Sequence, residues 1–156
     1  MVRKLSLIMT AAILMTLLLC TQSYAASIND VIYDESTLMR SSEEFLVAIT
    51  RPEGDETAFK QSYVICGNTE PKDIRVELAI VNKNGELEPF LNTDGESGWD
   101  VGESGIFMKE VILPSMGVNV IRIAAFKKSE ASDPKPGWNL QINDYTITVR
   151  EESFKE

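Results

Sequence analysis

Hydrophobic residues in this chain recur at every second position over short stretches. Residues 74–80 and 145–149 alternate aliphatic or aromatic side chains with polar or small ones. Because successive side chains of a β-strand point to opposite faces, this period predicts strands with one buried face. Apolar stretches predict five more strands, over 45–50, 60–66, 87–91, 106–113 and 118–126.

Clusters of glycine, proline, asparagine and aspartate separate the predicted strands. About seven short strands joined by such turns are typical of an all-β, antiparallel β-sandwich. The strongest turn signal is Asn84-Gly85, since both residues tolerate the positive φ of a type I′ turn. It predicts a hairpin between the strands at 74–80 and 87–91.

The first 25 residues have the features of an export signal. Arg3 and Lys4 supply positive charge, residues 5–19 form an apolar run, and Ser23-Tyr24-Ala25 has the small-residue pattern of a cleavage site. We therefore expect a signal peptide over residues 1–25, cleaved after Ala25. The mature protein is then secreted or held in the cell envelope.

Two alternatives stay open for this leader. An uncleaved anchor needs about 20 apolar residues to cross a bilayer, and this run is shorter. Leu17-Leu18-Leu19-Cys20 resembles the lipobox of bacterial lipoproteins, whose cysteine is lipidated, but Leu19 stands where that box usually has a small residue. Cleavage after Ala25 predicts no stable membrane insertion of the product.

Cleavage of the 156-residue chain leaves 131 residues, the size of one domain. Residues 26–44 are polar and acidic, which predicts an N-terminal linker able to fold back over the β-sandwich domain at 45–156. Loss of Arg3 and Lys4 changes the formal net charge from −9 to −11. This charge disfavours nucleic acid and anionic lipid surfaces as partners, because both attract basic proteins.

Cleavage also removes Cys20 and leaves Cys66 as the one cysteine, so no disulfide within the mature chain is possible. Cys66 ends the apolar run Tyr63-Val64-Ile65-Cys66. Free cysteine commonly behaves as a small buried hydrophobe, so we expect Cys66 to be buried and protected from thiol reagents. A reactive thiol or an intermolecular cross-link is the alternative.

The residue types present argue against catalysis. The chain has no histidine, which removes the commonest general base and the Ser–His and Cys–His dyads. A carboxylate pair of the kind that hydrolyses glycosides stays open, with candidates Asp94, Glu96, Asp100 and Glu103 in one glycine-rich loop. The same four carboxylates offer oxygen ligands to Ca²⁺, although their spacing does not fit the EF-hand pattern. We expect a solvated acidic loop, with no catalytic residue, metal or cofactor.

Two tryptophans complete the set of candidate binding residues. Trp99 lies within the acidic loop, and Trp138 follows Pro136-Gly137 in the loop before the last strand. Exposed aromatic rings recognise sugars or protein partners, which makes Trp99, Trp138, Asp94, Glu96 and Asp100 the candidate site. The alternative, which we favour, is that each ring closes an end of the sandwich, because tryptophan is on average highly buried.

Three segments together resemble a known family. They are Tyr63-Val64-Ile65-Cys66-Gly67-Asn68-Thr69-Glu70-Pro71, Gly105-Ile106-Phe107, and Gly117-Val118-Asn119-Val120-Ile121-Arg122-Ile123. The pattern is similar to bacterial immunoglobulin-like accessory domains of secreted glycosidases, proteases and cell-wall proteins, over residues 45–150. It departs from antibody domains because residues 121–125 hold no cysteine to pair with Cys66 and the strand at 74–80 has no tryptophan.

The resemblance implies an immunoglobulin-like fold and a spacer or interaction role. The function we expect is that of an exported, non-catalytic interaction or structural module, whose partner is an extracytoplasmic protein or a cell-wall glycan. One alternative is a small carbohydrate-binding protein that uses Trp99 and Trp138. A glycoside hydrolase with a carboxylate pair is the third. Function resides in sites rather than folds, so the resemblance leaves the ligand open.

Overall fold

The computed structural model describes residues 26–152. The expected signal peptide, its cleavage after Ala25 and the alternative lipidation of Cys20 concern residues outside this part. Within the described part, no helix is long and apolar enough to cross a membrane.

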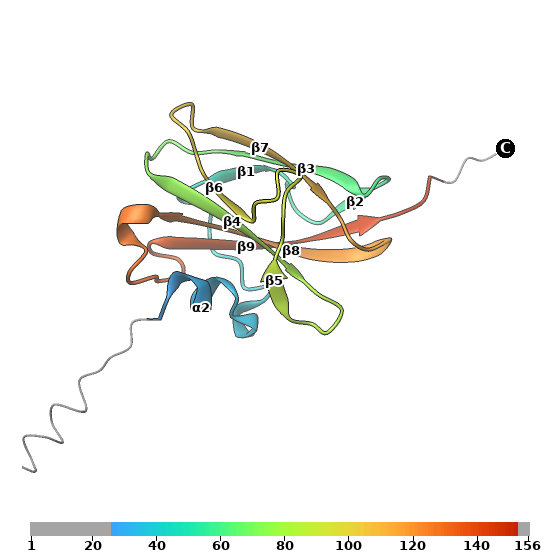
Figure 1. Ribbon diagram of the computed structural model, residues 1–156, viewed down its shortest axis with the longest axis horizontal. Coiled ribbons are helices and arrows are strands. Elements are labelled where there is room, and N and C mark those ends of the chain that lie inside the picture. Colours follow the sequence, from blue (N-terminus) through green and yellow to red (C-terminus); the bar gives the residue numbers. More distant parts are fainter. Residues whose placement is uncertain (1–25, 153–156) are drawn as a thin grey trace, which may run out of the picture.

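Residues 26–152 form an all-β structure of two sheets with a few short helical turns (Figure 1). One sheet has the strand order β1-β3-β7; the other has the order β2-β9-β8-β4-β5, and β6 also pairs with β4. The strands are β1 (Ala48–Arg51), β2 (Glu56–Ala58), β3 (Ser62–Asn68), β4 (Ile74–Val81), β5 (Leu87–Pro89), β6 (Gly98–Asp100), β7 (Ile106–Ile112), β8 (Gly117–Lys127) and β9 (Leu140–Val149). The helical turns are α2 (Ile28–Ile32), η1 (Glu35–Thr37) and η2 (Lys128–Glu130).

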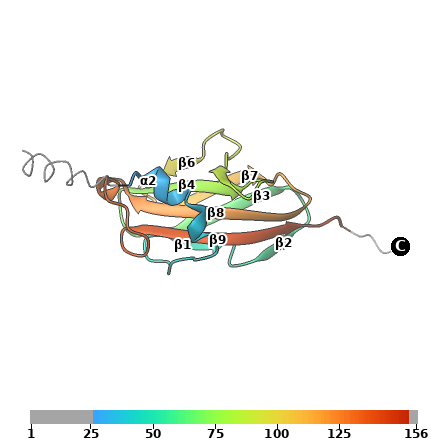
Figure 2. The ribbon, with the colours of Figure 1, turned by 90° about the horizontal axis from the view of Figure 1, so that it is seen from below.

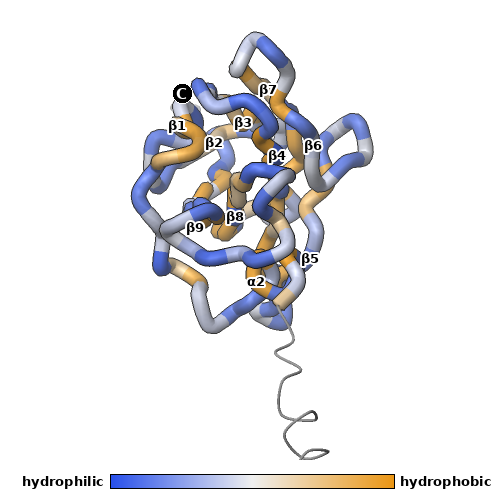
Figure 3. Tube along the Cα trace, turned by 90° about the vertical axis from the view of Figure 1, so that its left-hand side faces the viewer, coloured by the Kyte–Doolittle hydropathy of each residue, from blue (hydrophilic) through white to orange (hydrophobic). Residues whose placement is uncertain are grey.

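The two sheets lie as layers with one hydrophobic core between them (Figure 2). Every predicted strand is present, and the alternating residues point inward as expected from their period. The core draws on both sheets and includes Tyr63, Ile65, Val76, Leu78, Val111, Ile121, Ile123 and Ile147. Figure 3 shows hydrophobic residues gathered on the strands, while the connecting loops are mostly hydrophilic.

The sequence predicted antiparallel pairing throughout, but one pair of strands is parallel. After β1 the chain leaves the smaller sheet and adds β2 to the larger one, where β2 runs parallel to β9, with Glu56 opposite Ile147. The strand β6 is a second addition to the seven predicted strands. Its three residues lie in a glycine-rich stretch, where no alternation signals a strand.

The predicted hairpin between β4 and β5 is confirmed, but its turn is not type I′. Gly85 has a φ of 88°, whereas Asn84 does not share the positive φ that type I′ demands. Instead, the Asn82 side-chain oxygen accepts the N–H groups of Asn84 and Glu86, at 2.9 and 3.1 Å. This is the longer hairpin turn with a left-handed glycine at its end.

The N-terminal segment 26–44 packs on the outer face of the larger sheet. It contains the short helix α2, capped by Ser27, whose hydroxyl accepts the Asp30 N–H. Ile32 of α2 is fully buried in a second hydrophobic cluster with Phe126, Leu140 and Ile142 from β8 and β9. Figure 1 shows α2 against the sheet, so this segment covers apolar surface that would otherwise face water.

A polar side chain of β9, Gln141, holds residues 45–47, which connect the N-terminal segment to β1. The Gln141 side-chain oxygen accepts three successive backbone N–H groups, those of Phe45, Leu46 and Val47, at 2.8–3.0 Å. Its side-chain nitrogen donates to the carbonyl of Val47 at 2.9 Å. Gln141 is buried, and both polar atoms of its side chain are hydrogen-bonded. The strand β9 begins at Leu140, five residues before the strand predicted at 145–149.

A buried ion pair lies beneath the same segment. Arg122 of β8 and Asp144 of β9 form a bidentate pair, with Nε–Oδ1 and Nη2–Oδ2 distances of 2.7 and 2.9 Å. Both side chains are fully buried. The remaining Arg122 nitrogen donates to the carbonyls of Ile32 and Asp34, and the Met39 N–H donates to Asp144 at 2.8 Å. The N-terminal segment thus completes the hydrogen bonding of a charged pair that no water reaches.

Cys66 is less buried than the sequence predicted. Its neighbours Ile65 and Gly67 face the core, so the thiol of Cys66 points to the outer face of the smaller sheet, where it is half-buried. In the register, it lies between Arg51 and Met108. A continuous apolar run does not reveal which of its residues face inward, and this led to the wrong expectation.

We expect Cys66 to react with a thiol reagent in the folded protein, but more slowly than in denaturant, because the side chain is partly buried. The measurement is the labelling rate with and without denaturant, with Cys66→Ser as the unreactive control. Complete protection until unfolding would contradict this placement.

Candidate functional site

Trp138 is the most exposed large hydrophobic residue among those described, with 79% of its surface accessible. It lies in the loop between η2 and β9. A tryptophan that remains in water exposes a large apolar area, and such rings are common anchors of binding surfaces. The expectation that this ring closes an end of the fold is wrong for Trp138.

The loop that carries Trp138 is tied by its own hydrogen bonds. The Lys135 carbonyl accepts the N–H groups of Trp138 and Asn139 at 3.0 and 3.1 Å. In return, the Asn139 side chain accepts the Lys135 N–H at 2.6 Å and donates to the Asp133 carbonyl at 2.9 Å. The indole ring is therefore displayed from an ordered loop, and ordering it on binding costs little entropy.

Three loops meet at one end of the structure, which we call the loop end: residues 69–73, 101–105 and 128–139. The contact is direct, since the Lys128 N–H donates to the Asp73 carbonyl at 3.0 Å. A hollow of about 580 Å³ lies between 69–73 and 101–105 and reaches Lys128. This volume is in the range of ligand pockets, though the walls are polar rather than apolar.

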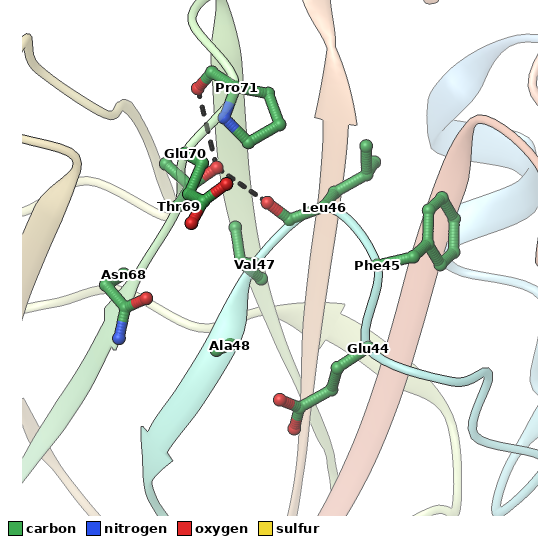
Figure 4. A pocket seen from close by; sticks show the side chains of 9 residues that line it. All are labelled: Glu44, Phe45, Leu46, Val47, Ala48, Asn68, Thr69, Glu70 and Pro71. Carbon is green, nitrogen blue, oxygen red and sulfur yellow. Dashed lines mark hydrogen bonds between the residues drawn. The ribbon is translucent and has the colours of Figure 1, made fainter.

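A second hollow of about 530 Å³ lies on the other side of the 69–71 turn, against residues 44–48 (Figure 4). Thr69 donates its hydroxyl to the Leu46 carbonyl at 2.6 Å and so holds the two walls together. The Glu44 carboxylate is already engaged by the Ile49 N–H and the Tyr145 hydroxyl, at 3.0 and 3.2 Å. The polar groups of this hollow mainly serve the fold.

Trp99 is buried, with 7% of its surface exposed. It lies on β6, and its ring packs against Phe107 of the other sheet, with centroids 5.6 Å apart at a tilt of 56°. Such tilted pairs are favourable beyond the area that they bury. For Trp99 the favoured expectation of a core plug is confirmed, and the ring is not available as a binding platform.

The acidic loop owes part of its composition to a turn. Residues 92–96 repeat the geometry of residues 82–86: the Asn92 side-chain oxygen accepts the N–H groups of Asp94 and Glu96, at 2.8 and 3.1 Å. Gly95 has a φ of 84°, as Gly85 has in the first turn. The matching sequences Asn-Lys-Asn-Gly-Glu and Asn-Thr-Asp-Gly-Glu could have revealed this repeat.

The carboxylates of this loop form two separate groups. Asp94 and Glu96 flank Lys109, whose nitrogen is 2.8 and 3.9 Å from their oxygens and lies over the Trp99 ring. Asp100 instead pairs with Lys128 and Arg75, at 2.9 and 3.3 Å. The hydrogen bond from Lys128, aided by Arg75, holds the pKa of Asp100 below its usual value.

This arrangement does not support the calcium alternative. Asp94, Glu96, Asp100 and Glu103 do not converge, and residues 26–152 contain no group of three or more acidic, histidine or cysteine side chains placed to hold a metal ion. Lysine or arginine side chains lie beside three of these carboxylates, those of Asp94, Glu96 and Asp100. The separation also weighs against a hydrolytic pair, which needs two carboxyl groups facing one bond.

The candidate residues are thus only partly brought together. Trp99 lies opposite Val76, which lies opposite Ala125, which in turn lies opposite Gln141 near Trp138. The strands β4 and β8 thus lie between the two tryptophans, with the Trp99 ring buried and the Trp138 ring exposed. Trp138 is left as the exposed aromatic of the candidate set.

Comparison with known proteins adds no relative. No protein-family model matches this chain, and no curated protein matches it in sequence.

Proposed function

We propose that this chain is an exported, non-catalytic interaction module with an immunoglobulin-like β-sandwich fold. It binds an extracytoplasmic partner through the loop end, with Trp138 as the anchor. The observation that carries the proposal is the 79% exposed indole on a hydrogen-bonded loop. Binding residues concentrate on loops that a rigid scaffold positions, and exposed tryptophans are the residues most enriched at interface centres.

The strand order supports the immunoglobulin-like part of the proposal. Immunoglobulin domains place their first, second, fourth and fifth strands in one sheet and their third, sixth and seventh in the other; beside β7, at the place of the fourth strand, this structure has the single bridge of Asn92 to Val111. Here β1, β3 and β7 share a sheet, and β4, β8 and β9 share the other, with β5 beside β4 as in variable-type domains. The loop end gathers the connections β3–β4 and β8–β9, which in variable domains carry binding residues.

The non-catalytic part rests on side-chain chemistry. The chain has no histidine. Asp94, Glu96 and Asp100 each pair with a lysine or arginine instead of facing a second carboxylate, and the pKa of Asp100 is held below its usual value by Lys128 and Arg75, the opposite of what a general acid needs. Export rests on the leader pattern at residues 1–25.

A protein partner fits this site better than a glycan. Carbohydrate binding through paired rings needs both Trp99 and Trp138, and burial of Trp99 leaves one ring. A single exposed tryptophan among polar loops matches the anchor-and-rim arrangement of protein interfaces. Cell-wall glycans are the second class of partner, and their binding is tested together with that of proteins.

The test uses the exported protein, whose intact mass should place its first residue at Ala26. The purified protein is immobilised and offered the extracytoplasmic protein fraction and soluble cell-wall glycans of its source. We expect saturable binding of one protein, lost in Trp138→Ala and kept in Phe59→Ala. Phe59 is a matched control, because it is an exposed aromatic near the opposite end of β9.

Binding that Trp138→Ala leaves unchanged would contradict the assignment of the loop end. Saturable binding of a glycan, lost in the same variant, would transfer the proposal to the carbohydrate class. A mass that retains residues 1–25, or one that begins at a lipidated Cys20, would contradict the processing expected here.

A further inference from the structure

The outer edge of β7 presents unpaired backbone groups. The strand β7 is last in the order β1-β3-β7. The Gly105 carbonyl accepts the Thr69 N–H at 2.7 Å, so odd-numbered residues direct their backbone groups toward β3. The Glu110 carbonyl accepts the Thr93 N–H at 2.8 Å, so even-numbered residues direct theirs to the outer edge.

Only part of this edge is covered. Segment 92–93 bridges to β7 at Glu110 and Val111. The rest of the edge, at Ile106 and Met108, has no neighbouring strand within the described part of the chain. The Ile106 N–H reaches the Ser104 hydroxyl at a long 3.4 Å. The Ile106 carbonyl and both backbone groups of Met108 have no hydrogen-bond partner within residues 26–152.

The side chains beside this edge are aliphatic. Ile106 and Met108 are 67% and 70% exposed on the outer face of the sheet. Proteins usually protect sheet edges with charge, proline or a covering segment. Such protection exists elsewhere here: the Glu44 carboxylate occupies the Ile49 N–H on β1, and β5 ends in Pro89. The edge at 106–108 has neither.

We propose that this edge pairs with the same edge of a second copy of the chain. Antiparallel self-pairing requires a two-fold axis, and an axis through Phe107 places Ile106 opposite the partner's Met108. Both residues direct their backbone groups outward, so each such pair exchanges both of its N–H···O=C bonds. The two smaller sheets then become one continuous sheet, and the aliphatic side chains of both copies adjoin across the axis.

The register is set by the covered part of the edge. An axis through Met108 would require Glu110 to pair, but its carbonyl already accepts the Thr93 N–H. The register centred on Phe107 therefore pairs the free residues Ile106 and Met108 with each other, which favours a second copy over a longer strand from another protein. A contact of this size belongs to the weak class of interfaces, and the negative charge of each copy makes it weaker at low salt.

The test measures self-association of the mature protein by sedimentation at concentrations up to about 1 mM, in salt of about 0.5 M to screen the charge. We expect a monomer–dimer equilibrium. Met108→Lys should raise the dimer dissociation constant by about tenfold or more, because each lysine then lies against the partner's Ile106 and diagonal to the second lysine across the axis. The matched control is Met116→Lys, since Met116 is also an exposed methionine, at 56%, and lies in the turn after β7; this variant should associate as the wild type does.

Hydrogen exchange of the unmodified protein gives an independent measurement. The Met108 amide should exchange rapidly in dilute solution and more slowly as the concentration rises, whereas the Val111 amide should not depend on concentration. A chain that remains monomeric across this range overturns the proposal. So does association that Met108→Lys leaves unchanged, since another surface would then be responsible.

Discussion

Replacing Arg122 with alanine is expected to lower the free energy of unfolding by about 3–5 kcal/mol, the range for breaking a buried ion pair. The substitution leaves the fully buried Asp144 carboxylate without its bidentate partner. It also leaves the carbonyls of Ile32 and Asp34 without the donor that they now share. Chemical denaturation monitored by circular dichroism measures the loss.

The control is Arg75→Ala on the same face of the same sheet. Arg75 pairs with Glu77 and Asp100, at 2.6 and 3.3 Å, but all three side chains keep some exposure to water. Water and salt screen such a pair, so its removal should cost about 0–1 kcal/mol. Equal losses in the two variants would show that burial of the Arg122 pair does not determine its contribution.

A double variant separates the charge from the packing. In Arg122→Met with Asp144→Leu, no charge remains buried, so the loss should be smaller than in Arg122→Ala, although the carbonyls of Ile32 and Asp34 and the Met39 N–H lose their partners. The N-terminal segment would then be held by Ile32 and its apolar neighbours and by the hydrogen bonds of Ser41 and Ser42 to β9. A double variant as unstable as Arg122→Ala would mean that the ion pair itself organises this segment.

The strands could be predicted from the sequence because burial imposes a period. Wherever one face of a strand meets the core, apolar residues recur at every second position, as at Ile74, Val76 and Leu78. The strand β9 breaks this rule in its first half. Gln141 and Asp144 are polar yet buried there, because the N-terminal segment supplies their partners, and no local pattern reveals a partner about one hundred residues away.

The candidate site was less accessible to prediction. The acidic loop was a candidate metal site because carboxylates in a glycine-rich loop can bind Ca²⁺. In the structure, Asn92 and Gly95 form a turn, and Lys109 of β7 pairs with the Asp94 carboxylate. The pairing with Lys109 depends on how the loop lies against the other sheet, which composition does not determine. The exposure of the β7 edge likewise follows from strand order and not from the residues of β7 themselves.

The two tryptophans have the same residue type and opposite environments, so substitution should separate them sharply. Trp99→Ala removes a buried ring that contacts Phe107 across the sheets, and it should lower the free energy of unfolding by about 3–5 kcal/mol. Trp99→Phe should lose less, because the indole N–H has no hydrogen-bond partner among residues 26–152 to forfeit and most of the aromatic contact is kept. Trp138→Ala, at an exposed position, should stay within about 0.5 kcal/mol of the unmodified protein.

For partner binding, the Trp138 variant should lose more than the Trp99 variant, the reverse of the order expected for stability. Trp138→Ala should weaken it by about 2 kcal/mol or more at an unchanged melting temperature, as truncation of an interface anchor does. Trp99→Phe, which remains folded, should bind as the unmodified protein does, because the ring at position 99 lies inside the core and offers no surface to a partner. Measuring melting temperature and affinity on the same preparations decides the matter. If Trp138→Ala lowers stability and leaves affinity intact, the exposed ring supports the fold, and recognition must lie on another surface.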